Sequence, residues 1–65
     1  MGRVSATDLK PGQVIRIEYG DYDNWMDFTV DAVEEAPKGI RVKCHKGRIE
    51  QSFLFKKSEI VEVKA

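Results

Sequence analysis

The sequence predicts an all-β fold in which five short strands form one small barrel. Three observations lead to this prediction: apolar and polar residues alternate in five segments, turn residues separate these segments at short intervals, and helical periodicity is nowhere sustained over ten residues. The 65 residues suffice for one domain near the lower size limit for independent folding. Closure into a barrel would remove the exposed edges of a five-stranded sheet. We therefore expect a single β-barrel domain over residues 1–65.

The N-terminal part is expected to lead into the barrel through a helical turn and a tight corner. Residues 5–10 can form one loose helical turn. Pro11-Gly12 fits a type II turn, because proline presets φ at the first corner and glycine accepts the positive φ at the second. The first strand follows over residues 13–19, where two isoleucines and Tyr19 share one face.

The second strand is predicted over residues 25–33, after a loop over residues 20–24. Its alternation directs Trp25 and Asp27 to the outer face. Four residues of this strand are expected to point inward: Met26, Phe28, Val30 and Ala32. The chain is then expected to turn over residues 34–39.

Three further strands are predicted over residues 40–44, 49–55 and 60–63. A tight turn at Lys46-Gly47 and a single 3₁₀-like turn near the C-terminus separate them. Ten side chains are expected to form the common core: Ile15, Ile17, Met26, Phe28, Val30, Val42, Cys44, Phe53, Val61 and Val63. Five short strands around one such core predict a small five-stranded SH3-like barrel, of the KOW or Sm type.

Three stretches resemble the N-terminal KOW-like barrel of bacterial elongation factor P and of its eukaryotic counterpart. They are Asp8-Leu9-Lys10-Pro11-Gly12-Gln13-Val14-Ile15, then Pro37-Lys38-Gly39-Ile40-Arg41-Val42-Lys43, and then Gly47 with Ile49-Glu50-Gln51-Ser52-Phe53. The resemblance covers the barrel and not the OB-type domains that follow it in that family. It implies a role in translation, with Lys38 matching the lysine that reaches toward the peptidyl-transfer centre. Sm-like and other KOW-like barrels stay open as relatives.

The charges are balanced overall but divided along the chain. There are 11 basic and 11 acidic residues, which argues against a general nucleic-acid coat. Seven acids and no Lys or Arg lie between Glu18 and Glu35, whereas five Lys or Arg residues, one His and no acid lie between Lys38 and Arg48. Because these blocks form two limbs of one hairpin, we expect either cross-strand ion pairs or an acidic and a basic flank.

Both alternatives concern the same outward side chains. Residues directly opposite each other on an antiparallel pair lie ~5 Å apart, so Asp27 and Asp31 are expected near Arg41, Lys43 or His45. Ordinary exposed cross-strand pairs would contribute roughly 0.2–1 kcal/mol each and carry no function. In the functional interpretation, the basic residues are instead available to a partner.

The leading functional prediction is a non-catalytic binding module. We expect it to contact RNA, or a ribonucleoprotein or translation partner, by neutralising phosphates with its basic side. That basic side comprises five residues: Arg41, Lys43, His45, Lys46 and Arg48.

A protein-interaction module is the competing prediction. It would be a small accessory or regulatory protein, of phage-like size, with an acidic and aromatic edge formed by Tyr19, Tyr22, Trp25 and Asp27. A third alternative is a homo-oligomer whose strands pair edge to edge, as in Sm-like rings.

Catalysis and metal binding are not expected. Cys44 and His45 are neighbours in a strand, so they point to opposite faces and cannot act as a nucleophile and its base. One cysteine leaves too few ligands for a structural zinc site, and we expect no cofactor. The longest apolar runs are too short to cross a membrane. A cytoplasmic, reducing location is the resulting expectation.

Overall fold

The computed structural model describes residues 2–18 and 24–64, and in these residues the fold is all-β. The strands and one short 3₁₀ helix follow each other in the order β1 (Gly2–Ser5), η1 (Ala6–Asp8), β2 (Val14–Glu18), β3 (Trp25–Ala36), β4 (Gly39–Lys46), β5 (Ile49–Phe55) and β6 (Ile60–Val63). Within these same ranges, no helix has the length and apolar character needed to cross a membrane.

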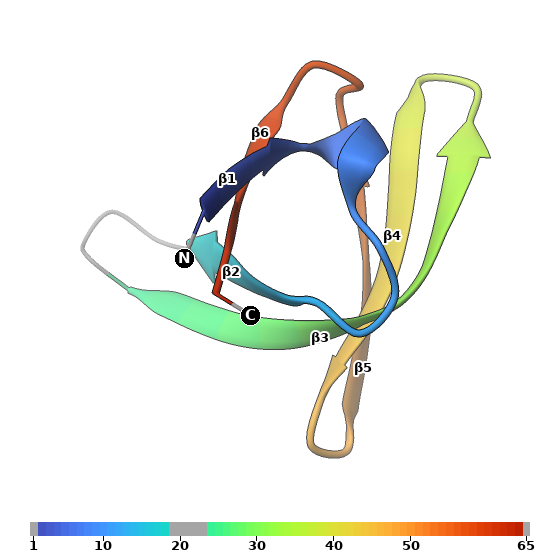
Figure 1. Cartoon of the computed structure of the whole chain (residues 1–65). Coiled ribbons are helices and arrows are strands. Elements are labelled where there is room, and N and C mark those ends of the chain that lie inside the picture. Colours follow the sequence, from blue (N-terminus) through green and yellow to red (C-terminus); the bar gives the residue numbers. More distant parts are fainter. Residues whose placement is uncertain (1, 19–23, 65) are drawn as a thin grey trace.

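The strands form a single antiparallel sheet in the order β1-β6-β2-β3-β4-β5. Figure 1 shows this sheet curving around the core, with β3 passing from beside β2 to beside β4. Among the described strands, β1 and β5 each have one neighbour, so the sheet keeps two edges. The all-β prediction is confirmed, whereas closure of the sheet into a barrel is not confirmed.

The bend of the sheet lies in β3, which is longer than predicted. Its first half pairs with β2 and its second half with β4, and Thr29 is opposite a residue of each. A β-bulge at Asp31 interrupts the second ladder between Val30 and Ala32. The extra residue reverses the alternation, so Val33 packs against the core while Ala32 lies opposite an outer residue of β4. The prediction that Ala32 points inward is therefore wrong.

The N-terminal segment contains one strand more than the sequence predicts. The predicted helical turn is present as η1, and β1 before it is a strand that was not predicted, pairing with β6. Gly12 has φ +93°, and the amide of Gln13 donates to the carbonyl of Lys10 at 3.3 Å, as a type II turn requires. The turn prediction at Pro11-Gly12 is confirmed.

The β3–β4 connection is a tight turn rather than the longer one predicted over residues 34–39. Ala36 pairs with Gly39, which leaves Pro37 and Lys38 as the turn residues. A Cβ atom at Gly39 would overlap the carbonyl oxygen of Phe55. Glycine at this position therefore lets the turn pack against the end of β5.

The core combines side chains from all six described strands and the N-terminal turn. Its buried members are Ala6, Leu9, Ile15, Phe28, Val30, Ile40, Val42, Cys44, Val61 and Val63. The predicted core residues Ile17, Met26 and Phe53 are partly buried against it. Phe28 and Phe53 meet edge to face, with ring centroids 5.4 Å apart and planes at 66°.

Candidate functional site

The predicted basic side is partly neutralised by β3. The Nζ atom of Lys43 lies 3.0 Å from Oε1 of Glu34. The Nδ1 atom of His45 lies 2.8 and 2.9 Å from the two carboxylate oxygens of Asp31, the bulge residue. Cross-strand pairing between the acidic and basic limbs is therefore confirmed for these two pairs, which are exposed and worth roughly 0.2–1 kcal/mol each.

Asp27 does not take part in this pairing, so its predicted position beside β4 is wrong. The first half of β3 pairs with β2, which places Asp27 opposite Arg16. One Asp27 oxygen accepts a hydrogen bond from Nζ of Lys64 at 3.0 Å, and the other lies 3.9 Å from Nε of Arg16. The change of partner strand within β3 could not be read from the charge pattern.

Three basic residues of the predicted set are exposed and make no ion pair within residues 2–18 and 24–64. Arg41 lies on β4, Lys46 ends that strand, and Arg48 lies in the β4–β5 turn. On the ladder, Arg41 is opposite Glu34 on one side and Leu54 on the other. The predicted basic side is therefore present only in part.

Trp25 and Asp27, from the predicted acidic and aromatic edge, come together around Arg16. The Trp25 side chain is 45% exposed, and the Arg16 guanidinium lies 4.6 Å from the centre of its ring. Arg16 also places Nη1 3.2 Å from Oε2 of Glu62 on β6. Tyr19 and Tyr22, the other members of the predicted edge, lie outside the described residues.

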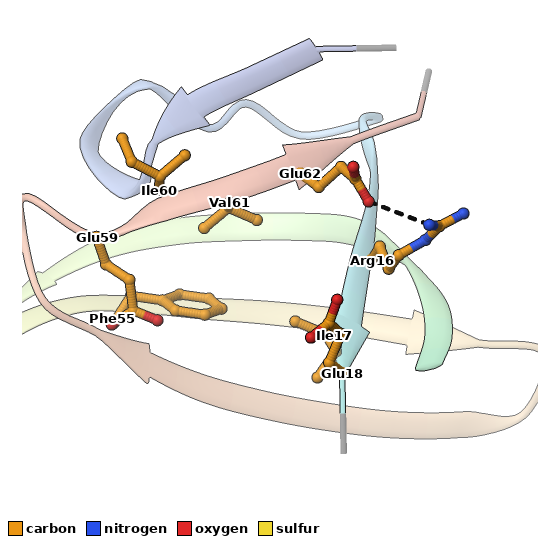
Figure 2. Close-up of a pocket in the computed structure, with 8 residues that line it drawn as sticks. All are labelled: Arg16, Ile17, Glu18, Phe55, Glu59, Ile60, Val61 and Glu62. Atoms are coloured by element: carbon orange, nitrogen blue, oxygen red, sulfur yellow. Dashed lines mark ion pairs between the residues drawn. The ribbon is translucent and has the colours of Figure 1, made fainter. Parts of the chain in front are cut away.

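A groove of about 340 Å³ lies beside this cluster, between the end of β2, the end of β5 and the start of β6 (Figure 2). This volume is at the lower end of the range of ligand-binding clefts. The apolar lining comes from Ile17, Phe55, Ile60 and Val61. Ile60 is 60% exposed, whereas Val61 beside it is buried.

The rim of the groove is acidic. Glu18, Glu59 and Glu62 line it together with one cation, Arg16. Arg16 forms an ion pair with Glu62, which leaves two carboxylates that no described cation pairs with. Glu59 is positioned by the β5–β6 turn, where its Oε1 atom accepts a hydrogen bond from the Lys56 amide at 3.3 Å. Figure 2 shows Glu59 beside Phe55 on one side of the groove and Glu18 on the other.

The sequence offered one signal for this groove that the predictions did not use. Ile60 and Val61 are adjacent in a strand, so only one of them can point into the core. Val61 was assigned to the core, and an exposed isoleucine at the head of β6 follows from that assignment. The association of Ile60 with the end of β2 depends on the curvature of the sheet, which the sequence pattern does not contain.

The chemical properties of Cys44 are those of a core residue. Burial raises the pKa of its thiol from 9.0 to about 11, and the charge of Asp31 adds to this effect. The thiolate is therefore scarce near neutral pH. Residues 2–18 and 24–64 hold no group of three or more His, Cys, Asp or Glu residues placed to bind a metal.

Comparison with family models found no match to this chain. Comparisons with curated proteins and with solved structures also found no match.

Proposed function

We propose that this chain is a non-catalytic protein-interaction module, built on a partly open SH3-like barrel. The strand order supports this barrel type: β2, β3, β4 and β5 pair in succession, and β6 returns to pair with β2. The strands of this run surround one core. β1 adds a strand on the outer edge of β6.

The observation that carries the proposal is the groove between β2, β5 and β6. An exposed apolar residue, Ile60, lines the groove together with Ile17, Phe55 and Val61, and an aromatic residue stacked on Arg16 lies nearby. Exposed apolar surface rimmed by polar residues is typical of protein-interaction sites. The alternative of a free basic side has less support, because Lys43 is paired with Glu34 and His45 with Asp31.

Selection of binding peptides from a random display library tests the proposal. We expect selected peptides to lose binding to the Ile60→Ser variant. Ile49→Ser is the matched control, because Ile49 is also an exposed isoleucine, at 49%, but lies at the opposite end of β5 from the groove. Peptides that bind both variants equally well, or a selection that yields no binder, would contradict the proposal.

RNA binding is the second candidate function, and it rests on the three exposed cations Arg41, Lys46 and Arg48. These cations would contact phosphates of an RNA or of a ribonucleoprotein in the translation machinery, as the likeness to elongation factor P suggests. The predicted role of Lys38 and the cytoplasmic location also stay predictions.

A salt titration with a single-stranded oligoribonucleotide tests this candidate. Replacing all three cations by Gln should reduce the slope of log affinity against log salt by about 2, because each phosphate contact contributes about 0.7. Lys64→Gln, which removes one charge at a lysine bound to Asp27, should leave the slope nearly unchanged. Absence of binding at low salt would exclude the candidate.

A further inference from the structure

We infer that the groove receives a Lys or Arg side chain, carried by an extended segment of a partner protein that pairs with the free edge of β5. This inference rests on the proposed function, because it specifies which kind of partner segment occupies the same groove. It joins two observations: an unpaired strand edge that ends at the groove, and an apolar groove whose rim is acidic.

The edge of β5 is available within the described part of the chain. β5 is the last strand of the sheet, and β4 is its one neighbour. Five of its seven residues are exposed: Ile49, Glu50, Gln51, Ser52 and Leu54. In an antiparallel sheet, every second residue of an edge strand directs its backbone N–H and C=O groups away from the neighbouring strand. An added strand can satisfy these groups, which is the usual basis of peptide recognition by strand addition.

The edge leads directly to the groove. Phe55, the last residue of β5, forms part of the groove wall. Figure 2 shows β5 along one side of the groove and β6 along the other, with Phe55 and Ile17 between them. A segment paired with β5 can therefore place one side chain over Phe55 while its backbone stays on the edge.

The lining of the groove favours a basic side chain. Lys and Arg combine an aliphatic stem with a charged end group, so the stem can cover Phe55 and Ile17. The charge then lies between two carboxylates, those of Glu18 and Glu59, that no described cation pairs with. Three acids and one cation line the groove, a net charge of −2, which disfavours an acidic side chain at the same place.

NMR titration with capped peptides tests the inference. The probe is the peptide Thr-Val-Thr-Lys-Thr-Val-Thr, and the matched peptides carry norleucine or Glu in place of Lys. We expect the Lys peptide to shift the amide signals of Phe55 and Ile60, and to bind about fivefold more tightly than the norleucine peptide. The Glu peptide should bind most weakly. Equal affinities, or no shift with the Lys peptide, would overturn the inference.

Two controls separate the charge from the strand pairing. The Glu18→Gln, Glu59→Gln double variant should remove the preference for Lys over norleucine, whereas Glu50→Gln, a change on β5 outside the groove, should retain it. A Lys peptide with alternate backbone nitrogens methylated should bind at least about tenfold more weakly, since it cannot pair with β5. Unchanged binding of the methylated peptide would exclude strand addition.

The failure of this inference differs from failure of the proposed function. Selected peptides that depend on Ile60 but show no preference for Lys or Arg would overturn the inference and leave the proposed function intact. Protein that forms a dimer without peptide, with β5 amides protected from exchange, would show that a second copy occupies the edge, and this also overturns the inference.

Discussion

Gly39 lies so close to the backbone of Phe55 that no side chain fits between the β3–β4 turn and the end of β5. The φ angle of Gly39 is not positive, so this glycine is required for close packing and not for an unusual backbone conformation. The contact is made by the backbone of Phe55, which also forms a wall of the groove. The β3–β4 turn therefore packs against the same residue that lines the candidate site.

Gly39→Ala is expected to destabilise the fold by about 1–3 kcal/mol, because the added methyl group must displace the Phe55 carbonyl. Urea unfolding monitored by Trp25 fluorescence measures this difference. Gly2→Ala is the control, since a Cβ atom there meets nothing within 4 Å. Equal unfolding midpoints for the two variants would show that the turn does not pack tightly on β5.

Ile15→Ala is expected to cost about 2–5 kcal/mol, because Ile15 is fully buried at the centre of the core. A loss of this size approaches the total stability of a small domain. Ile60→Ala removes the same atoms from an exposed position, so its effect on the unfolding midpoint should be small. A larger effect at Ile60 than at Ile15 would contradict the assigned orientation of β2 and β6.

Arg16 and Trp25 are expected to stabilise each other by about 0.5–1 kcal/mol through the cation–π contact. A double-mutant cycle with Arg16→Met and Trp25→Leu measures this coupling energy from urea unfolding. Arg16→Met leaves the carboxylate of Glu62 without its ion-pair partner in both backgrounds, so this contribution cancels in the cycle. A coupling energy of zero would mean that the two side chains do not interact in solution.

Stability at alkaline pH should depend on Cys44. Its folded-state pKa, about 11, is above the ordinary value of 9.0, so the folded state retains the thiol proton that the unfolded state loses. The resulting stabilisation is complete below pH 9 and is lost as the pH rises to about 11.

The Cys44→Ala variant is expected to lack this contribution. Between pH 9 and 11, the free energy of unfolding of the wild type should therefore fall more steeply than that of the variant. Urea unfolding across this pH range gives both slopes. Lysines and tyrosines titrate in both proteins, so their contributions cancel in the difference between the two slopes. Parallel slopes would show that the Cys44 thiol is accessible to water.

The protein is expected to be monomeric in the absence of a partner, with a mass of 7.4 kDa by light scattering. Edge-to-edge pairing into a ring needs two strand edges in each copy. In the described sheet one of these edges is β1, which covers β6 and has four residues. An Sm-like ring would have a mass several times larger. A concentration-independent mass of that size would favour the homo-oligomer alternative over the groove.

Alternation predicted most of the core and five of the strands. Phe53 and Phe55 face the core while Leu54 is exposed, as the pattern of β5 indicates. The strand β1 was missed because its four residues contain one apolar side chain, Val4, which is too few for a periodic signal. Ala32 was misplaced because nothing in the residue types marks Asp31 as a bulge.

The candidate site was harder to predict than the core. Trp25 and Asp27 were identified as an edge, but their shared partner Arg16 comes from a strand that the charge pattern did not connect to them. The groove needs residues from β2, β5 and β6 that meet only when the sheet curves. Local sequence patterns indicate which face of each strand is buried, but they do not indicate how the whole sheet curves.

An NMR map of the surface that contacts selected peptides locates the binding site of this protein most directly. We expect the largest shifts at Glu18, Phe55 and Ile60, around the groove. Shifts centred on Arg41, Lys46 and Arg48 would contradict this expectation and place the binding surface on the basic side.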